Sequence, residues 1–98
     1  MKLEYISTFY SDIASVSDYL EDYPQKAKRL FGKLDIKLNN LVDNPELYPI
    51  YKDYPEFRRI VIEDYLVFYS IDKQAEIIEV HRLIAGKMDI PIQLIENN

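Results

Sequence analysis

The sequence predicts an α+β domain: a short N-terminal strand, a two-helix antiparallel hairpin, and then a three-stranded antiparallel sheet. The stretch 57–85 (FRRIVIEDYLVFYSIDKQAEIIEVHRLIA) holds three segments rich in β-branched and aromatic residues, which favour strands. The polar breaks between these segments are too short for a helical crossover, so consecutive strands are expected to pair antiparallel. The first half of the chain instead repeats apolar residues at the three- and four-residue spacing of helices.

The N-terminal residues predict an edge strand that leads into the first helix. Polar and apolar residues alternate over residues 2–7 (KLEYIS). Ser7 or Thr8 is expected to cap the helix by accepting a hydrogen bond from a free backbone N–H. Asp12 falls in the first turns, where the helix dipole favours negative charge. The apolar stripe of this helix consists of Phe9, Ile13, Val16 and Leu20.

A second helix is expected to begin at Pro24, because proline is well suited to a first helical position. It should end near the sequence Asp43-Asn44-Pro45. Only a few residues separate the two helices, so they should lie antiparallel. The apolar stripe of the second helix consists of Ala27, Leu30, Phe31, Leu34, Leu38 and Leu41.

The register of the sheet follows if Glu63-Asp64 forms a two-residue turn. Side chains alternate along a strand, so one face would carry Arg58, Ile60, Ile62, Tyr65, Val67, Tyr69 and Ile71. The other face would carry Phe57, Arg59, Val61, Leu66, Phe68 and Ser70. Neither face is plainly polar, so we expect helices on one and a loop, the tail or a partner on the other. The turn lacks glycine, so the alternative is a longer loop with the register shifted by one residue.

Composition limits the class of protein. The 98 residues suffice for one small domain, and we assign residues 1–98 to a single domain. The net charge of −5 argues against long-range attraction to nucleic acid. The absence of cysteine suits a reducing cytoplasm. We expect no signal peptide and no membrane span, because the first 20 residues are interrupted by acidic residues and the longest apolar run is Tyr65–Tyr69.

Two stretches are candidates for partner contact. Tyr48, Tyr51 and Tyr54 recur every third residue in the proline-interrupted segment 44–56. These rings either pack the segment onto the domain or form a contact surface for a partner. The C-terminal tail is too apolar to be free in water and should pack on the domain or on a partner; its candidates are Ile92, Leu94 and Ile95.

The candidate chemical groups are few. One histidine, no cysteine and two glycines make a zinc site or a phosphate-binding loop improbable, and no cofactor is expected. A cationic cluster remains: Arg58, Arg59, His81, Arg82 and Lys87. The guanidinium of an arginine on a small sheet must remain solvated or be paired with an opposite charge. One interpretation is ion pairing along the sheet with Glu63, Asp64, Glu76 or Glu79. The other is a site for RNA phosphate, where an acid, a base and positive charge would suffice for transfer from a 2′-hydroxyl.

The order of these elements resembles the RelE/ParE superfamily of toxins from bacterial type II toxin–antitoxin pairs. The likeness is carried by residues 57–62 (FRRIVI), 64–69 (DYLVFY) and 82–89 (RLIAGKMD), with Tyr23-Pro24, Ala27 and Asn44-Pro45 in the helical half. The resemblance implies a cytoplasmic toxin of a growth-inhibiting, plasmid-stabilising module, held inactive by a cognate antitoxin. A homodimer is a second assembly that we consider for this chain.

The superfamily has two kinds of target. RelE-like members cut mRNA on the ribosome, and ParE-like members act on DNA gyrase. RelE-like enzymes usually carry an arginine after the Gly-Lys turn, where this chain has Met88, and many have a histidine or tyrosine where it has Ala85. These departures favour a ParE-like, attenuated toxin. The alternatives are an mRNA interferase using Arg59, His81, Arg82 and Lys87, and a non-toxic module that binds only an antitoxin-like partner.

Overall fold

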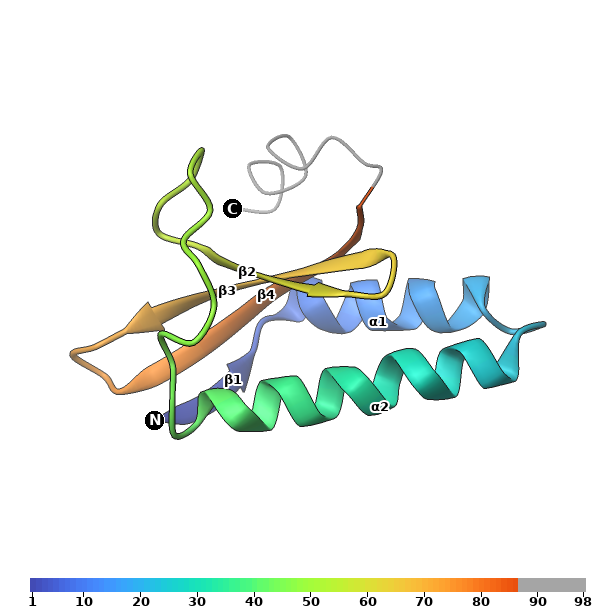
Figure 1. The fold of residues 1–98 in the computed structure, drawn as a ribbon, viewed down its shortest axis with the longest axis horizontal. Helices are drawn as coiled ribbons and strands as arrows, with labels where there is room; N and C mark the ends of the chain where they lie inside the picture. The colour runs from blue at the N-terminus through green and yellow to red at the C-terminus, as the bar shows by residue number, and fades with distance from the viewer. Residues whose placement is uncertain (87–98) are drawn as a thin grey trace.

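A computed structural model, which describes residues 1–86, places two helices against a four-stranded sheet (Figure 1). In chain order the elements are β1 (Lys2–Tyr5), α1 (Ser7–Tyr19), α2 (Pro24–Leu41), β2 (Arg58–Ile62), β3 (Tyr65–Asp72) and β4 (Ile77–Ala85). The α+β class, the antiparallel helices and the three-stranded meander agree with the prediction. The difference is that the N-terminal strand joins the meander as a fourth strand.

That fourth strand makes the sheet mixed. The strand order is β1-β4-β3-β2, and β1 runs parallel to β4, with Lys2 opposite Ile77 and Tyr5 opposite Val80. Because β1 is shorter than β4, it covers only the first part of that strand's edge. The remaining part of the edge, from His81 onward, lies beside α1.

The hairpin between β2 and β3 has the two-residue turn on which the predicted register depends. Ile62 pairs with Tyr65 and Arg58 pairs with Tyr69. Glu63 adopts the left-handed conformation (φ 54°) that such turns favour for glycine. Its carboxylate contacts Arg29 and Lys33 of α2, at 2.8 and 3.1 Å. These ion pairs attach the turn to α2 and hold the residue in place without a glycine.

The pairing of β3 with β4 contains a bulge. Phe68 pairs with Arg82 but Tyr69 pairs with Val80, so His81 is an extra residue on β4. A bulge interrupts the alternation of side chains. Val80 and Leu83 therefore belong to one buried cluster, whereas His81 contacts Phe57 of the other.

The larger core lies between the helices and one face of the sheet. It includes Phe9, Leu30, Leu34, Leu38, Leu41, Ile60, Ile62, Val67, Tyr69, Ile78 and Val80. The helices contribute the stripes that the sequence predicts. The capping prediction is wrong: Ile6 occupies the N-cap position, and no side chain caps α1. Thr8 instead donates to the backbone carbonyl of His81, because β1 ends before it can reach that carbonyl.

The second face of the sheet is covered by the segment between α2 and β2. Phe57, Leu66, Phe68 and Ile84 form a small buried cluster, and Tyr51 and Tyr54 pack against it. The segment is attached to β2 by the pairing of Ile50 with Arg58. Both faces are thus covered, with a loop on the second face, as the apolar residues on both faces predict.

Candidate functional site

Side chains of α1 form hydrogen bonds with the backbone at the end of β4, in place of the bonds that a neighbouring strand would make. The carboxylate of Asp12 accepts the backbone N–H of Leu83 at 2.9 Å. It also accepts two bonds from the Arg82 guanidinium, from Nε at 2.6 Å and Nη2 at 2.9 Å. The side chains of Arg82 and Asp12 are only 10% and 15% exposed. The candidate cation Arg82 is therefore held in a buried bidentate ion pair.

His81 lies on the second face of the sheet. Its Nε2 is 2.8 Å from Ser70 Oγ, and its ring meets Phe57 edge to face, with centroids 5.0 Å apart. Burial lowers the pKa of His81 from its ordinary value of 6.5, and Glu79 opposes this effect. The lowered pKa favours the neutral ring near pH 7.

Arg58 and Arg59 have contacts other than the acidic ones expected along the sheet. Arg58 donates to the carbonyls of Tyr48 (2.8 Å) and Glu46 (3.4 Å). The Arg59 guanidinium lies over the Tyr51 ring, 5.9 Å from its centroid. Together with the Arg82–Asp12 pair, these contacts differ from the ion pairing expected along the sheet, because loop carbonyls, an aromatic ring and a helix carboxylate contact the three arginines.

The structure brings most of the predicted catalytic candidates to one face. Arg59 and Arg82 are both register partners of Phe68, so they flank it in a single cross-strand row. Their backbones are therefore about 10 Å apart. His81 adjoins this row through the bulge. Lys87, the remaining candidate, lies outside the described residues, as do Ile92, Leu94 and Ile95 of the tail.

The three candidate tyrosines of the loop contact the domain itself. Tyr51 stacks with Tyr54 and meets Phe68 edge to face, with centroids 6.4 and 5.3 Å apart. Tyr48 packs against the larger core, with the Lys37 ammonium 5.6 Å from its ring centroid. All three rings keep part of their surface exposed. They attach the loop to the domain and leave a partly aromatic surface along it.

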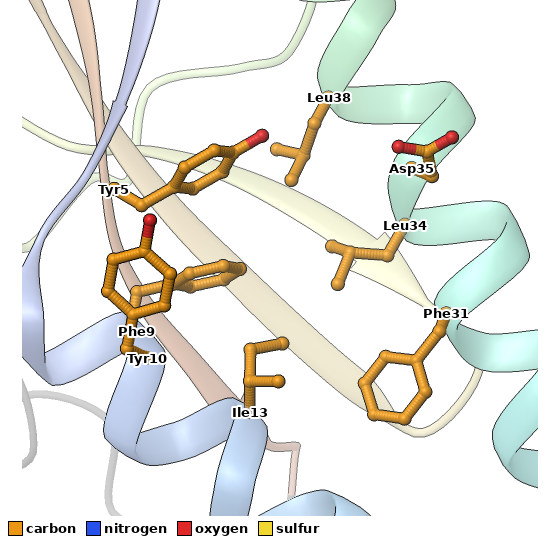
Figure 2. A pocket seen from close by; sticks show the side chains of 8 residues that line it. All are labelled: Tyr5, Phe9, Tyr10, Ile13, Phe31, Leu34, Asp35 and Leu38. Atoms are coloured by element: carbon orange, nitrogen blue, oxygen red, sulfur yellow. The ribbon is translucent and has the colours of Figure 1, made fainter.

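A groove that sequence reasoning missed lies between the two helices. Figure 2 shows aromatic side chains from the end of β1 and the start of α1 on one side and side chains of α2 on the other. The groove has a volume of about 250 Å³ and is lined by Tyr5, Phe9, Tyr10, Ile13, Phe31, Leu34, Asp35 and Leu38. Tyr5 stacks on Phe9 and meets Tyr10 edge to face, with centroids 5.5 and 5.9 Å apart. Among the described residues of this lining, Asp35 is the only acidic one.

The groove could have been suspected from the sequence, because two of its aromatic residues lie outside the predicted apolar stripe. Tyr5 and Tyr10 lie outside the apolar stripe of α1, and they are 38% and 60% exposed. Large rings beside an already complete stripe widen the apolar surface beyond what the core requires. Burial, followed by the nearby charge of Asp35, raises the pKa of Tyr5, so its hydroxyl remains a hydrogen-bond donor at neutral pH.

A second, wider hollow of about 750 Å³ borders the ion pair, between α1, the β2–β3 turn and the end of β4. Its described lining includes Asp12, Tyr19, Lys26, Tyr65 and Arg82. Across residues 1–86, no group of three or more His, Asp and Glu side chains is placed to bind a metal ion. In the same range, neither helix combines the length and apolar character needed to cross a lipid bilayer.

Comparisons with known proteins agree with this geometry. Residues 3–90 match the family described as "ParE toxin of type II toxin-antitoxin system, parDE". A structure of the chromosomal ParDE toxin–antitoxin system from P. aeruginosa superposes with a TM-score of 0.72 at 14% identity, covering 89% of this chain and 97% of that one. The isolated E. coli RelE toxin superposes with a TM-score of 0.64 at 10% identity, covering 97% and 95%. No curated protein sequence matches the chain significantly. At these identities, the two superpositions establish the fold.

Proposed function

Because the chain belongs to the family of ParE toxins of type II toxin–antitoxin systems, we propose that it inhibits bacterial growth by binding DNA gyrase in the cytoplasm. A cognate antitoxin would bind the free toxin and suppress this activity. The toxin class and the antitoxin partner follow from the family. The choice of gyrase over the ribosome depends on the side chains described above.

The ion pair between Arg82 and Asp12 is the observation that carries the choice. A ribonuclease needs cations that face the developing charge on phosphate. Arg82 directs Nε and Nη2 to a nearly buried carboxylate, so much of its hydrogen-bonding capacity serves the fold. Ser70 lies within hydrogen-bonding distance of Nε2 of His81, so one ring nitrogen is also engaged within the fold. This arrangement supports a binding protein more than a nuclease.

Two sequence departures point the same way. Ala85 and Met88 replace the histidine or tyrosine and the arginine that RelE-like enzymes usually carry around the Gly-Lys turn. The loss of one preorganised charge contact of this kind costs about 3 kcal/mol of transition-state stabilisation. A chain lacking these groups would be a poor ribonuclease but could still bind a protein target.

The second candidate function is an mRNA interferase. The observation in its favour is the shared face of Arg59, His81 and Arg82, with Phe68 between the two arginines. Two cations on one face could bind neighbouring RNA phosphates, whereas Phe68 itself is fully buried and takes no part. Lys87, which lies outside the described residues, is the remaining cation of this candidate.

Induction of the chain in a bacterium separates these functions. For the gyrase proposal, we expect growth arrest with loss of plasmid supercoiling, intact cellular mRNA, and inhibition of purified gyrase by the purified chain. A combined Arg59→Ala, His81→Gln and Lys87→Ala variant, which keeps the Arg82–Asp12 pair, should still arrest growth. Ribosome-dependent mRNA cleavage that disappears in this variant would instead establish the interferase.

A third outcome would identify a non-toxic interaction module. In that case cells grow normally at high soluble expression, while the chain still binds the product of an adjacent antitoxin-like reading frame. Normal growth of this kind would refute an active toxin without affecting the fold.

A further inference from the structure

The edge of β4 beside α1 is only partly hydrogen-bonded. The His81 carbonyl accepts the Thr8 hydroxyl, and the Leu83 N–H donates to Asp12 at 2.9 Å. The N–H and C=O of one strand residue point to the same side, and every second residue points to that side. The Leu83 carbonyl and both backbone groups of Ala85 therefore face the same way, and no group in the described part of the chain bonds to them. Asp12 completes this edge only as far as the Leu83 N–H.

The unbonded edge forms one wall of the hollow of about 750 Å³ that borders the ion pair. Leu83, Ile84 and Ala85 line the hollow on the β4 side, and Val16 and Tyr19 line it on the α1 side. Open backbone groups of a strand favour an extended partner, which pairs with them as a further strand. The aliphatic and aromatic side chains around them favour a partner with apolar residues.

The chain itself continues from the rim of this hollow. Gly86 donates its N–H to the Asp64 carbonyl at 2.9 Å, and Asp64 and Ala85 both line the hollow. A segment tethered at the rim has a high effective concentration there, which a separate molecule lacks. Residues 87–98 lie outside the described residues; they follow directly and include Ile90, Pro91, Ile92, Leu94 and Ile95.

We propose that residues 90–92 return antiparallel to β4, occupy this hollow and bond to its open edge as an additional short strand. Residues 86–89 (GKMD) would form the connecting turn, which places Ile90 opposite Ala85 and Ile92 opposite Leu83. This strand would form whichever target the toxin binds, because it closes the chain's own sheet. It would also keep strands of other proteins away from the edge.

The proline at position 91 agrees with this register. In an antiparallel pair, residues that bond to the partner strand alternate with residues that do not. Ile90 would bond to both backbone groups of Ala85, and the Ile92 N–H would donate to the Leu83 carbonyl. Pro91 has no N–H and falls between them, where its nitrogen points away from β4. A turn shorter by one residue would instead place Pro91 opposite Leu83, where a donor is needed.

The same register directs the apolar side chains toward the core. Residues opposite each other share a face of the sheet. Ile90 and Ile92 would therefore share the helix-facing side with Ala85 and Leu83, which lie in or against the larger core. Ile92 would contact Val16 of α1, which packs against the same core. The contacts that α1 already makes with β4 would end the added strand at this point.

The first test moves the proline by one position. Ile92→Pro removes the N–H that bonds to Leu83, whereas Pro91→Ala leaves the pairing intact. In the unmodified chain and in Pro91→Ala, the Ala85 amide should exchange with deuterium about fivefold or more slowly than in Ile92→Pro, measured by nuclear magnetic resonance. Unchanged exchange of amides in the middle of β3 would separate loss of the added strand from global unfolding. Equal exchange of Ala85 in all three chains would overturn the proposal.

The second test locates the Ile92 side chain. Nuclear Overhauser contacts should join its methyl groups to those of Val16 in the unmodified chain. Ile92→Asp should remove the strand and speed exchange of the Ala85 amide, because it would place a charge against apolar side chains. The control, Asn97→Asp, adds the same charge farther along the tail and should leave exchange unchanged. If no contact joins Ile92 to Val16, the proposed position is wrong.

A mixed sample distinguishes the tail from other occupants of the hollow. In a mixture of isotope-labelled and unlabelled chains, contacts between Ile92 of one copy and Val16 of another would indicate exchange of tails in a dimer and overturn the intramolecular strand. A hollow that stays empty in the isolated chain and is filled only when another protein binds would also overturn it. Growth arrest and gyrase inhibition are measured separately, so either result leaves the proposed function standing.

Discussion

Asp12 in α1 and Arg82 in β4 are 70 residues apart in the sequence, and two hydrogen bonds of 2.6 and 2.9 Å join their side chains. The same carboxylate accepts the N–H of Leu83, so one side chain both neutralises a strand arginine and completes the hydrogen bonding of the strand edge. Edge strands expose unpaired backbone groups that other chains can bind. In this chain α1 occupies that position beside β4, where β1 has already ended.

Removal of the Asp12 carboxylate should be strongly destabilising. Asp12→Ala would take the counter-charge from a nearly buried guanidinium and the acceptor from Leu83, so we expect a loss of about 3 kcal/mol in the free energy of unfolding. Replacement of both partners, with Asp12→Ala and Arg82→Met, should recover part of this loss because no buried charge remains. Urea denaturation measures both variants. A double variant less stable than the single one would contradict this account.

The roles of Ser7 and Thr8 can be separated by matched substitutions. Thr8→Val keeps the shape of the side chain but removes the 2.8 Å bond to the His81 carbonyl, so it should cost about 1 kcal/mol. Ser7→Ala should have almost no effect, because Ser7 is exposed and the helix has no side-chain cap. Chemical denaturation of the two variants provides the comparison. A larger loss for Ser7→Ala would indicate the capping role expected from the sequence.

His81 should make folding sensitive to mild acid. Burial lowers its pKa in the folded protein below the ordinary value of 6.5, so the unfolded chain binds the proton more readily. The stabilising effect of the neutral ring is therefore complete above about pH 6.5 and decreases as the pH falls toward the folded pKa. In His81→Gln this decrease should be absent. Unfolding midpoints measured between pH 7.5 and about 5 test the difference, and identical pH profiles would rule out His81 as its source.

The Tyr69 hydroxyl should hold the beginning of the loop that covers the second face. It donates to the Pro45 carbonyl at 2.8 Å from a fully buried ring. Tyr69→Phe should lower the free energy of unfolding by about 1 kcal/mol and speed proteolysis within residues 44–56. The control, Tyr10→Phe, alters a largely exposed hydroxyl and should change neither quantity. Equal proteolysis of both variants would show that the hydroxyl does not hold the loop.

Side-chain alternation was sufficient to predict the hairpin. Once Glu63-Asp64 is taken as a two-residue turn, every pairing from Arg58–Tyr69 to Ile62–Tyr65 follows, and the structure has these pairs. The bulge at His81 could not be predicted in this way, because it depends on contacts from outside the two strands. The sequence also identified Arg82 as a strand cation that needs an explanation. With 17 acidic residues in the chain, however, it could not identify Asp12 as the partner.

The sequence by itself determined the local features: the two helices, the three strands of the meander, and the apolar character of both sheet faces. It reduced the register at the turn to two alternatives, of which the structure has the two-residue turn. These depend on residue spacing within one or two neighbouring segments. Only the tertiary structure decided that β1 pairs parallel with β4, that Asp12 meets Arg82, and that aromatic residues of β1 and α1 form a groove with α2. Each of these contacts joins segments that distant parts of the chain bring together, and no spacing within a segment encodes which distant side chain will be nearest.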